Sequence, residues 1–100
     1  MKPGRQRLDK WLWFARFAKT RTLAAKLVDD GYVRVNGHRA EAPAKAVAVG
    51  DVITIAVSRE TALVRVLDLG QRRGPPPEAR LLYQAVPRDD GALVTGDPKG

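Results

Sequence analysis

At 100 residues the chain can form one small domain with a single modest core, and it contains no cysteine, which excludes a disulfide framework and a thiolate metal site. No segment approaches the roughly 20 apolar residues of a membrane span, and the N-terminal MKPGRQR lacks an apolar run after its charges, so we expect a soluble, cytoplasmic protein with no membrane partner. The net charge is +7 and the excess lies entirely in residues 1–40, which indicates a polyanionic partner, above all nucleic acid, with charge that only confers solubility as the alternative.

The first predicted element is an amphipathic helix from Leu8 to Phe17, a stretch without any helix-breaking residue. Trp13 and Phe17 lie off its apolar face. They either cover a second contact, such as the chain's own C-terminal segment, or stack on a base. At about 100° per residue, the apolar face is formed by Leu8, Trp11, Leu12, Phe14, Ala15 and Ala18.

A second helix is predicted to begin at Thr20, whose hydroxyl can cap it, and to end near Gly31. Lys19 and Arg21 place two cations at its N-terminus, where the helix dipole favours anions, and Lys26 lies on its polar side. The predicted buried side is formed by Leu23, Ala24, Leu27 and Val28.

A two-residue hairpin turn is predicted at Asn36-Gly37, because both turn positions require positive φ and these residues tolerate it best. The register then places Arg34 directly opposite Arg39, and Val35 opposite His38 on the other face. Two opposed arginines repel each other at a cost of some tenths of a kcal/mol. Such departures from local consistency are found most often at functional sites, and a polyanion would relieve this one.

The strands that follow complete an α+β fold. Gly50-Asp51 marks a turn, and residues 52–57 and 62–69 alternate as strands, giving a small, mostly antiparallel sheet packed on two helices. Three prolines then lead into a short helix, predicted from Glu78 to about Val86, that lays Leu82 and Tyr83 on the body. We therefore divide the chain into a domain of residues 1–70, an appended segment of residues 71–86 and a mobile tail of residues 87–100.

Little in the sequence supports catalysis. His38, the single histidine, falls beside the apolar face of the hairpin, which favours a packed or partly exposed side chain over a catalytic base. The acid pairs Asp29-Asp30 and Asp89-Asp90 point in different directions and come with no partner base or ligand set. No Gly-rich phosphate loop is present. We expect no enzyme activity, no cofactor and no metal site.

These motifs resemble the RNA-binding domain named after small ribosomal subunit protein four. An Arg-Leu-Asp helix start, a Thr-Arg start to the second helix, the run Gly-Tyr-Val-Arg-Val-Asn-Gly and a later Gly-Asp turn follow the order of that family, at residues 7–9, 20–21, 31–37 and 50–51. The stretches RLDKWLWFARFAKTR and QRRGPPPEARLLY are similar to one branch, the heat shock protein fifteen family of ribosome-associated proteins.

The resemblance implies a helix pair on a small sheet that binds structured RNA through one basic face. For this branch it also implies association with the large ribosomal subunit in the heat-shock response or in recycling of stalled ribosomes that still hold a nascent chain on transfer RNA. By position, the residues carried over are Arg7, Asp9, Thr20, Arg21 and the turn Val35-Asn36-Gly37. Asp9 is expected to complement the first turn of its helix or to orient a nearby arginine, not to touch RNA.

We predict a groove for ribosomal RNA, with or without transfer RNA, that reads shape and phosphate spacing more than base sequence. Arg21 and the free N–H groups of its helix would hold one phosphate, and Arg34 and Arg39 would straddle another. The predicted RNA-binding residues are Arg7, Lys10, Arg16, Lys19, Thr20, Arg21, Lys26, Arg34, Asn36 and Arg39.

Three alternatives stay open at this point. The protein could bind double-stranded DNA, serve as the RNA-specificity subunit of an RNA-modifying enzyme, or act as a chaperone-like protein through Trp13 and Phe17. In each case we expect a monomer, because nothing in the sequence requires more than one copy.

Overall fold

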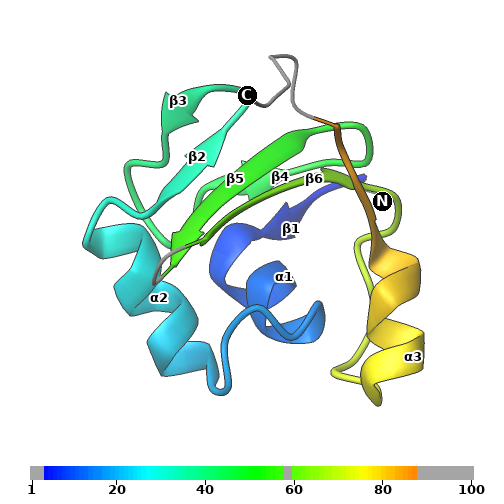
Figure 1. Ribbon diagram of the computed structural model, residues 1–100. Helices are drawn as coiled ribbons and strands as arrows, with labels where there is room; N and C mark the ends of the chain where they lie inside the picture. The colour runs from blue at the N-terminus through cyan, green and yellow to red at the C-terminus, as the bar shows by residue number, and fades with distance from the viewer. Residues whose placement is uncertain (1–3, 58–59, 88–100) are drawn as a thin grey trace.

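The two predicted amphipathic runs form helices. In the computed structural model, which describes residues 4–57 and 60–87, helix α1 spans Leu8–Phe14 and helix α2 spans Arg21–Asp29. Thr20 caps α2 as predicted, its hydroxyl accepting the Leu23 N–H at 3.0 Å. α1 lies beneath the sheet, between α2 and the short helix α3, Pro76–Ala79 (Figure 1).

Antiparallel strands form two sheets, so the predicted α+β fold is confirmed. The smaller sheet pairs β1 with β4, and the larger has the strand order β3-β2-β5-β6-β7 (Figure 1). The bounds are β1 Gln6–Arg7, β2 Val33–Val35, β3 His38–Arg39, β4 Ala46–Val47, β5 Val52–Val57, β6 Glu60–Val66 and β7 Tyr83–Ala85.

The hairpin between β2 and β3 has the predicted register. Arg34 lies opposite Arg39 and Val35 opposite His38, and Asn36 and Gly37 have φ values of 53° and 85° in the turn. His38 is exposed. The hairpin is anchored to the centre of the sheet because β2 also pairs with β5.

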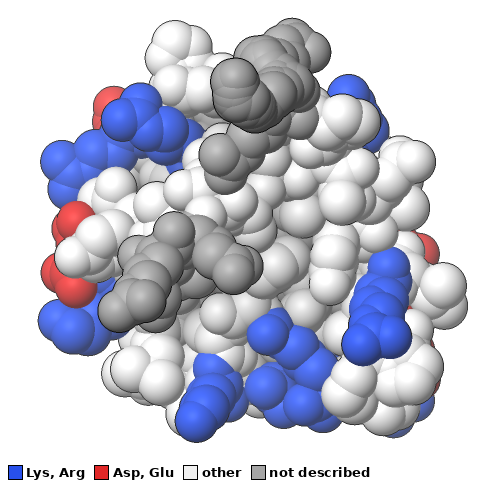
Figure 2. Space-filling view, in the orientation of Figure 1, with Lys and Arg blue, Asp and Glu red and all other residues white. Residues whose placement is uncertain are grey.

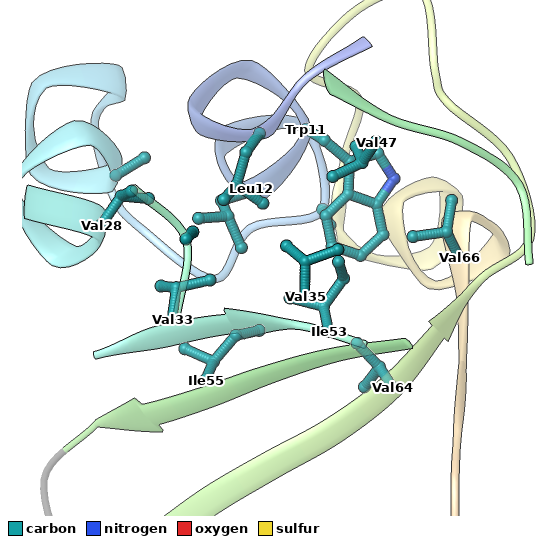
Figure 3. Close-up of a cluster of buried hydrophobic side chains, with 14 of the residues drawn as sticks. Trp11, Leu12, Val28, Val33, Val35, Val47, Ile53, Ile55, Val64 and Val66 are labelled. Carbon is teal, nitrogen blue, oxygen red and sulfur yellow. The ribbon is translucent and has the colours of Figure 1, made fainter. Parts of the chain in front are cut away.

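The core lies between α1, α2 and the inner face of the larger sheet. Side chains from both layers point toward one another there (Figure 3), and all six residues of the predicted α1 face are buried. Burial of each large apolar side chain contributes roughly 1.5–3 kcal/mol. The largest fully buried side chains are Trp11, Leu8, Leu12, Ile53, Ile55, Val28, Val33, Val47 and Val66.

Helix α1 is shorter than predicted, because it ends at Phe14 and not at Phe17. The chain turns at Arg16, which has a left-handed φ of 67°. The Arg16 N–H donates to the Trp13 carbonyl and the Phe17 N–H to the Leu12 carbonyl, which is the hydrogen-bond pattern of a Schellman helix end. Phe17 then packs 4.8 Å from Tyr83, ring centroid to ring centroid, so a tertiary contact holds the turn.

The predicted buried side of α2 is too wide. Ala24 and Val28 are buried and Leu27 is half-buried, but Leu23 is exposed. The reason is that α2 lies at the edge of the helical layer, with α1 as its helical neighbour, so only a narrow stripe of its surface meets the core (Figure 1).

The C-terminal part of the described chain also departs from the predicted helix over Glu78–Val86. It forms α3, a 3-10 turn η1 (Arg80–Leu82) and then β7. β7 pairs along β6, with Tyr83 opposite Val66, because the free backbone groups of an edge strand are better satisfied by another strand than by a helix. The expected placement of Leu82 and Tyr83 on the body is confirmed, since Leu82 is buried and Tyr83 packs on the core.

The segment after β6 is joined to α1 and to η1 by hydrogen bonds. The Trp11 indole N–H donates to the Asp68 carbonyl at 2.9 Å, and the Leu67 N–H donates to the Leu82 carbonyl at 2.8 Å.

The mobile tail is predicted for residues 87–100. Apart from Pro87, this tail lies outside the described residues, and so does its Asp89-Asp90 pair. Across residues 4–57 and 60–87, no helix has the length and apolar character to cross a membrane.

Candidate nucleic-acid interface

A buried carboxylate organises the cations at the start of α1 and α2. Asp9 is 3% exposed and accepts two hydrogen bonds from Arg7, from Nε at 3.1 Å and from Nη2 at 3.0 Å. The Nε of Arg21 lies 3.8 Å from the same carboxylate, which also accepts the Lys10 N–H at 2.7 Å. Asp9 therefore makes both of the contacts predicted for it, with an arginine and with the first turn of its helix.

The charge of this cluster is not balanced. One carboxylate serves two guanidinium groups, and the Arg7 and Arg21 side chains keep 50% and 43% of their surface exposed. Lys19, just before the cap of α2, is exposed as well, and the first turn of α2 has no acidic residue. The start of α2 thus combines exposed cations with the positive end of the helix dipole, an arrangement that favours an anion.

The second basic cluster is the opposed arginine pair of the hairpin. Arg34 Nη1 donates to the Gly37 carbonyl at 3.4 Å, and Arg39 Nη2 donates to the Asp29 carbonyl at 3.3 Å. Both partners are backbone oxygens, and among the described residues neither arginine forms an ion pair. Each guanidinium is thus oriented by a carbonyl, Arg34 toward the hairpin turn and Arg39 toward the end of α2, and both charges stay available to a ligand.

Two of the predicted site residues use their polar groups within the protein. The Asn36 side chain accepts the Val52 N–H at 2.9 Å and donates to Asp51 at 3.2 Å, which ties the hairpin turn to the turn before β5. The Thr20 hydroxyl caps α2. Both groups thus accept a hydrogen bond in the free protein, and these contacts are structural.

The remaining predicted cations are distributed around these clusters. Lys26 pairs with Asp30 at 3.2 Å, which largely neutralises that part of α2. The Lys10 ammonium lies 5.6 Å from the centroid of Phe14. Arg16 reaches the C-terminal segment, donating from Nε to the Gly74 carbonyl at 2.7 Å. The structure thus brings Arg7 and Arg21 to one carboxylate and pairs Arg34 with Arg39 across the hairpin, whereas Arg16 lies near the C-terminal segment.

Sequence reasoning missed two arginines of the C-terminal segment, Arg73 and Arg80. They line a surface hollow together with Arg16 and Lys19. Figure 2 shows Lys and Arg side chains along the lower rim of the molecule, between α2 and α3, and a second group at the upper left near β2 and β3. The sequence holds the signal QRRGPPPEAR, but its proximity to the end of α1 comes only from the fold.

Neither aromatic residue that lies off the α1 face is free. Arg73 lies 5.8 Å over the Trp13 ring, and Phe17 contacts Tyr83 and Trp11. Of the two interpretations of these side chains, the structure supports contact with the C-terminal segment.

In the described part of the chain, no group of three or more His, Cys, Asp or Glu residues lies close enough to hold a metal ion.

Comparison with known proteins matches this architecture. A family model described as the S4 domain matches residues 6–53, which include α1, α2 and the hairpin. The heat shock protein 15 homolog of Aeromonas salmonicida is 46% identical over 78 residues, which make up 78% of this chain and 58% of that protein. The RQC P-site tRNA stabilizing factor of Bacillus subtilis is 38% identical over 63 residues, which make up 63% of this chain and 72% of that protein.

A solved structure gives the same result. Heat shock protein 15 of Vibrio cholerae, described as trimeric, aligns with a TM-score of 0.78 at 41% identity, covering 82% of both chains. The helix pair and hairpin therefore define an S4 domain, the class that the sequence motifs resemble. The chain belongs to the heat shock protein 15 family of S4-type RNA-binding proteins. It spans 58% of the length of the Aeromonas relative.

Proposed function

We propose that this protein binds structured ribosomal RNA, with or without transfer RNA, and that its partner is the large ribosomal subunit. The proposed contact surface, here called the basic face, consists of the two clusters Arg7-Arg21 and Arg34-Arg39 with the cations around them. Its residues are Arg7, Lys10, Lys19, Thr20, Arg21, Lys26, Arg34, Asn36 and Arg39, and the predicted residue Arg16 adjoins it through the hollow that it lines with Lys19. The protein would act there as a binding protein without catalytic activity or cofactor, in the cytoplasm.

The opposed arginines are the observation that carries this proposal. A sheet gains nothing from two arginines at directly paired positions, and within the described residues their guanidinium groups donate to backbone carbonyls and to no carboxylate. Phosphates of an RNA strand that runs along this face would supply the missing negative charge and accept hydrogen bonds from both guanidinium groups. A second phosphate would bind at the start of α2, near Arg21 and the first-turn N–H groups that the Thr20 hydroxyl leaves free.

The names of the relatives support an RNA target in translation. One relative is named for stabilising transfer RNA in the P site, and another is the small ribosomal subunit protein uS4 of Erythrobacter litoralis, 42% identical over 96 residues. From these names we infer a role on ribosomes, and from the heat shock protein 15 relatives a role in the heat-shock response. The resemblance of the sequence motifs to that family adds recycling of stalled ribosomes to the proposal. The basic face offers mainly cations, which bind phosphates, so RNA shape would be read more than base sequence.

Sedimentation of cell lysate through sucrose gradients tests the proposal. The wild type should travel with the large subunit, and the variant that combines Arg21→Ala and Arg34→Ala should stay at the top, with a larger difference at moderate than at low salt. Arg72→Ala is the matched control, since Arg72 is an exposed arginine paired with Glu78 at 2.9 Å and outside the basic face. A wild-type protein that also stays at the top would overturn the ribosomal role.

Two further measurements address the alternatives. Competition between duplex DNA and structured RNA in a gel shift should favour RNA, and a clear preference for DNA would contradict the proposal. A pull-down should recover ribosomal components, whereas stable recovery of an RNA-modifying enzyme would point to a specificity subunit. Light scattering would test the expected monomer, which stays a prediction beside the trimeric Vibrio cholerae structure.

A further inference from the structure

A groove of about 540 Å³ lies between the loop that follows α1 and the segment formed by α3, η1 and β7. Its walls come from parts of the chain about 55 residues apart, such as Arg73 and Ala18. No Asp or Glu is among the described residues that line it. Its lining includes the cations Arg16, Lys19, Arg73 and Arg80 and the aromatic residues Phe17 and Tyr83.

Backbone carbonyls hold two of these guanidinium groups in place. Arg73 donates from Nε to the Trp13 carbonyl at 3.1 Å and from Nη2 to the Ala18 carbonyl at 3.4 Å. Arg16 donates to the Gly74 carbonyl. A carbonyl oxygen orients a guanidinium without neutralising it, so both arginines keep their positive charge beside the groove that they line.

The other two cations are free to meet a ligand. Lys19 and Arg80 are exposed, and in the part of the chain that the structure describes neither forms an ion pair. The contact between Phe17 and Tyr83, with ring centroids 4.8 Å apart, supplies an apolar wall beside them. Four cations around such a wall form a site for a phosphate with its attached sugar and base.

The backbone conformation of Arg16 also supports a role of this groove in binding. The residue occupies the left-handed position of a helix end, where glycine has no steric cost and another residue loses roughly 1–2 kcal/mol. Strain of this kind persists where the surrounding structure enforces it, and it gathers at functional sites. Here it places Arg16 in the lining of the groove.

We propose that this groove is a second RNA contact, which takes a phosphodiester of the strand that leaves the start of α2. This inference rests on the proposed function and extends it beyond residues 6–53, the part of the chain matched by the S4 domain. Lys19 connects the two surfaces, because it lines the groove and directly precedes the Thr20 cap of α2. The C-terminal segment thereby becomes part of the binding surface.

Binding of large-subunit ribosomal RNA, measured by filter binding across a series of salt concentrations, tests the inference. Arg80→Gln should lower the affinity about 3- to 10-fold and reduce the slope of log K against log salt by about 0.7–0.9, the value for one lost phosphate contact. Arg80→Lys should keep the slope near that of the wild type, because it preserves the charge. Arg72→Gln is the control, since Arg72 lies in the same segment but outside the groove, and its affinity should stay within about twofold of the wild type.

The outcomes separate this inference from the proposed function. Arg80→Gln could bind RNA with the same affinity as Arg72→Gln, while the variant that combines Arg34→Gln and Arg39→Gln loses binding. In that case the groove does not contact RNA, but the basic face does. If the wild type does not bind the RNA, the proposed function and the inference both fail. Arg80 is exposed, so unchanged thermal unfolding of Arg80→Gln is expected and would show that a loss of affinity is not a loss of folding.

Discussion

Helices α1 and α2 end in the same hydrogen-bonded motif but with different residues at its left-handed position. In α2 the residue is Gly31, with φ of 85°, and in α1 it is Arg16, with φ of 67°. The N–H groups of Gly31 and Tyr32 donate to carbonyls three and five positions back, as do those of Arg16 and Phe17. One geometry is thus reached in two ways.

The two helix ends are therefore stabilised by different interactions. Glycine adopts positive φ without steric cost, so α2 stops at a place that local chemistry alone favours. Arginine does not, so the end of α1 depends on contacts that a distant segment supplies, through Phe17 on Tyr83 and Arg16 on Gly74. A variant at the end of α1 should therefore lose stability because a tertiary contact is removed, and a variant at the end of α2 because the backbone is strained.

The largest effect is expected from Phe17→Ala. Phe17 is half-buried and contacts both Trp11 and Tyr83, so truncation should lower the free energy of unfolding by about 2 kcal/mol, less than the roughly 3–5 kcal/mol of a fully buried phenylalanine. Denaturant unfolding measures this. The control is Leu81→Ala, an exposed position two residues before Tyr83, which should cost under about 0.5 kcal/mol. Equal losses of stability in the two variants would contradict the conclusion that a tertiary contact determines where α1 ends.

Gly31→Ala should give the next largest loss, about 1–2 kcal/mol, because alanine is strained at this φ. Its Cβ would also lie 3.1 Å from Arg39 Nε, so the arginine side chain must shift. Gly37→Ala is the matched variant, with the same φ of 85° and nothing within 4 Å of its Cβ. Thermal unfolding of both variants separates backbone strain from displacement of Arg39, and an unchanged melting temperature for Gly31→Ala would refute the account of the α2 end.

Arg16→Gly should have the smallest effect on stability and a clear effect on binding. Relief of about 1 kcal/mol of backbone strain is offset by loss of the hydrogen bond to Gly74, so the free energy of unfolding should stay within about 0.5 kcal/mol of the wild type. RNA affinity should fall about 3- to 10-fold if the guanidinium serves the groove. A destabilisation above about 2 kcal/mol would instead show that Arg16 mainly fastens the C-terminal segment.

The parts of the RNA-binding site that depend on residues close together in the sequence could be predicted from the sequence. Asn36-Gly37 fixes the hairpin register, so the opposition of Arg34 and Arg39 follows from the order of the residues alone. The link between Arg7, Asp9 and Arg21 was only partly accessible, because an arginine near Asp9 was expected but its identity depends on how α1 and α2 pack. Arg73 and Arg80 were missed for the same reason.

The sequence by itself determined the α+β class, the capped second helix, the hairpin and the concentration of positive charge in residues 1–40. These features depend on residues a few positions apart, whose turn, capping and periodic preferences act within that distance. Only the tertiary structure decided where α1 ends, that residues 83–85 form a strand and that four cations surround one groove. Each of these results depends on burial and on hydrogen bonds between groups far apart in the sequence, such as Trp11 with Asp68, which no local pattern encodes.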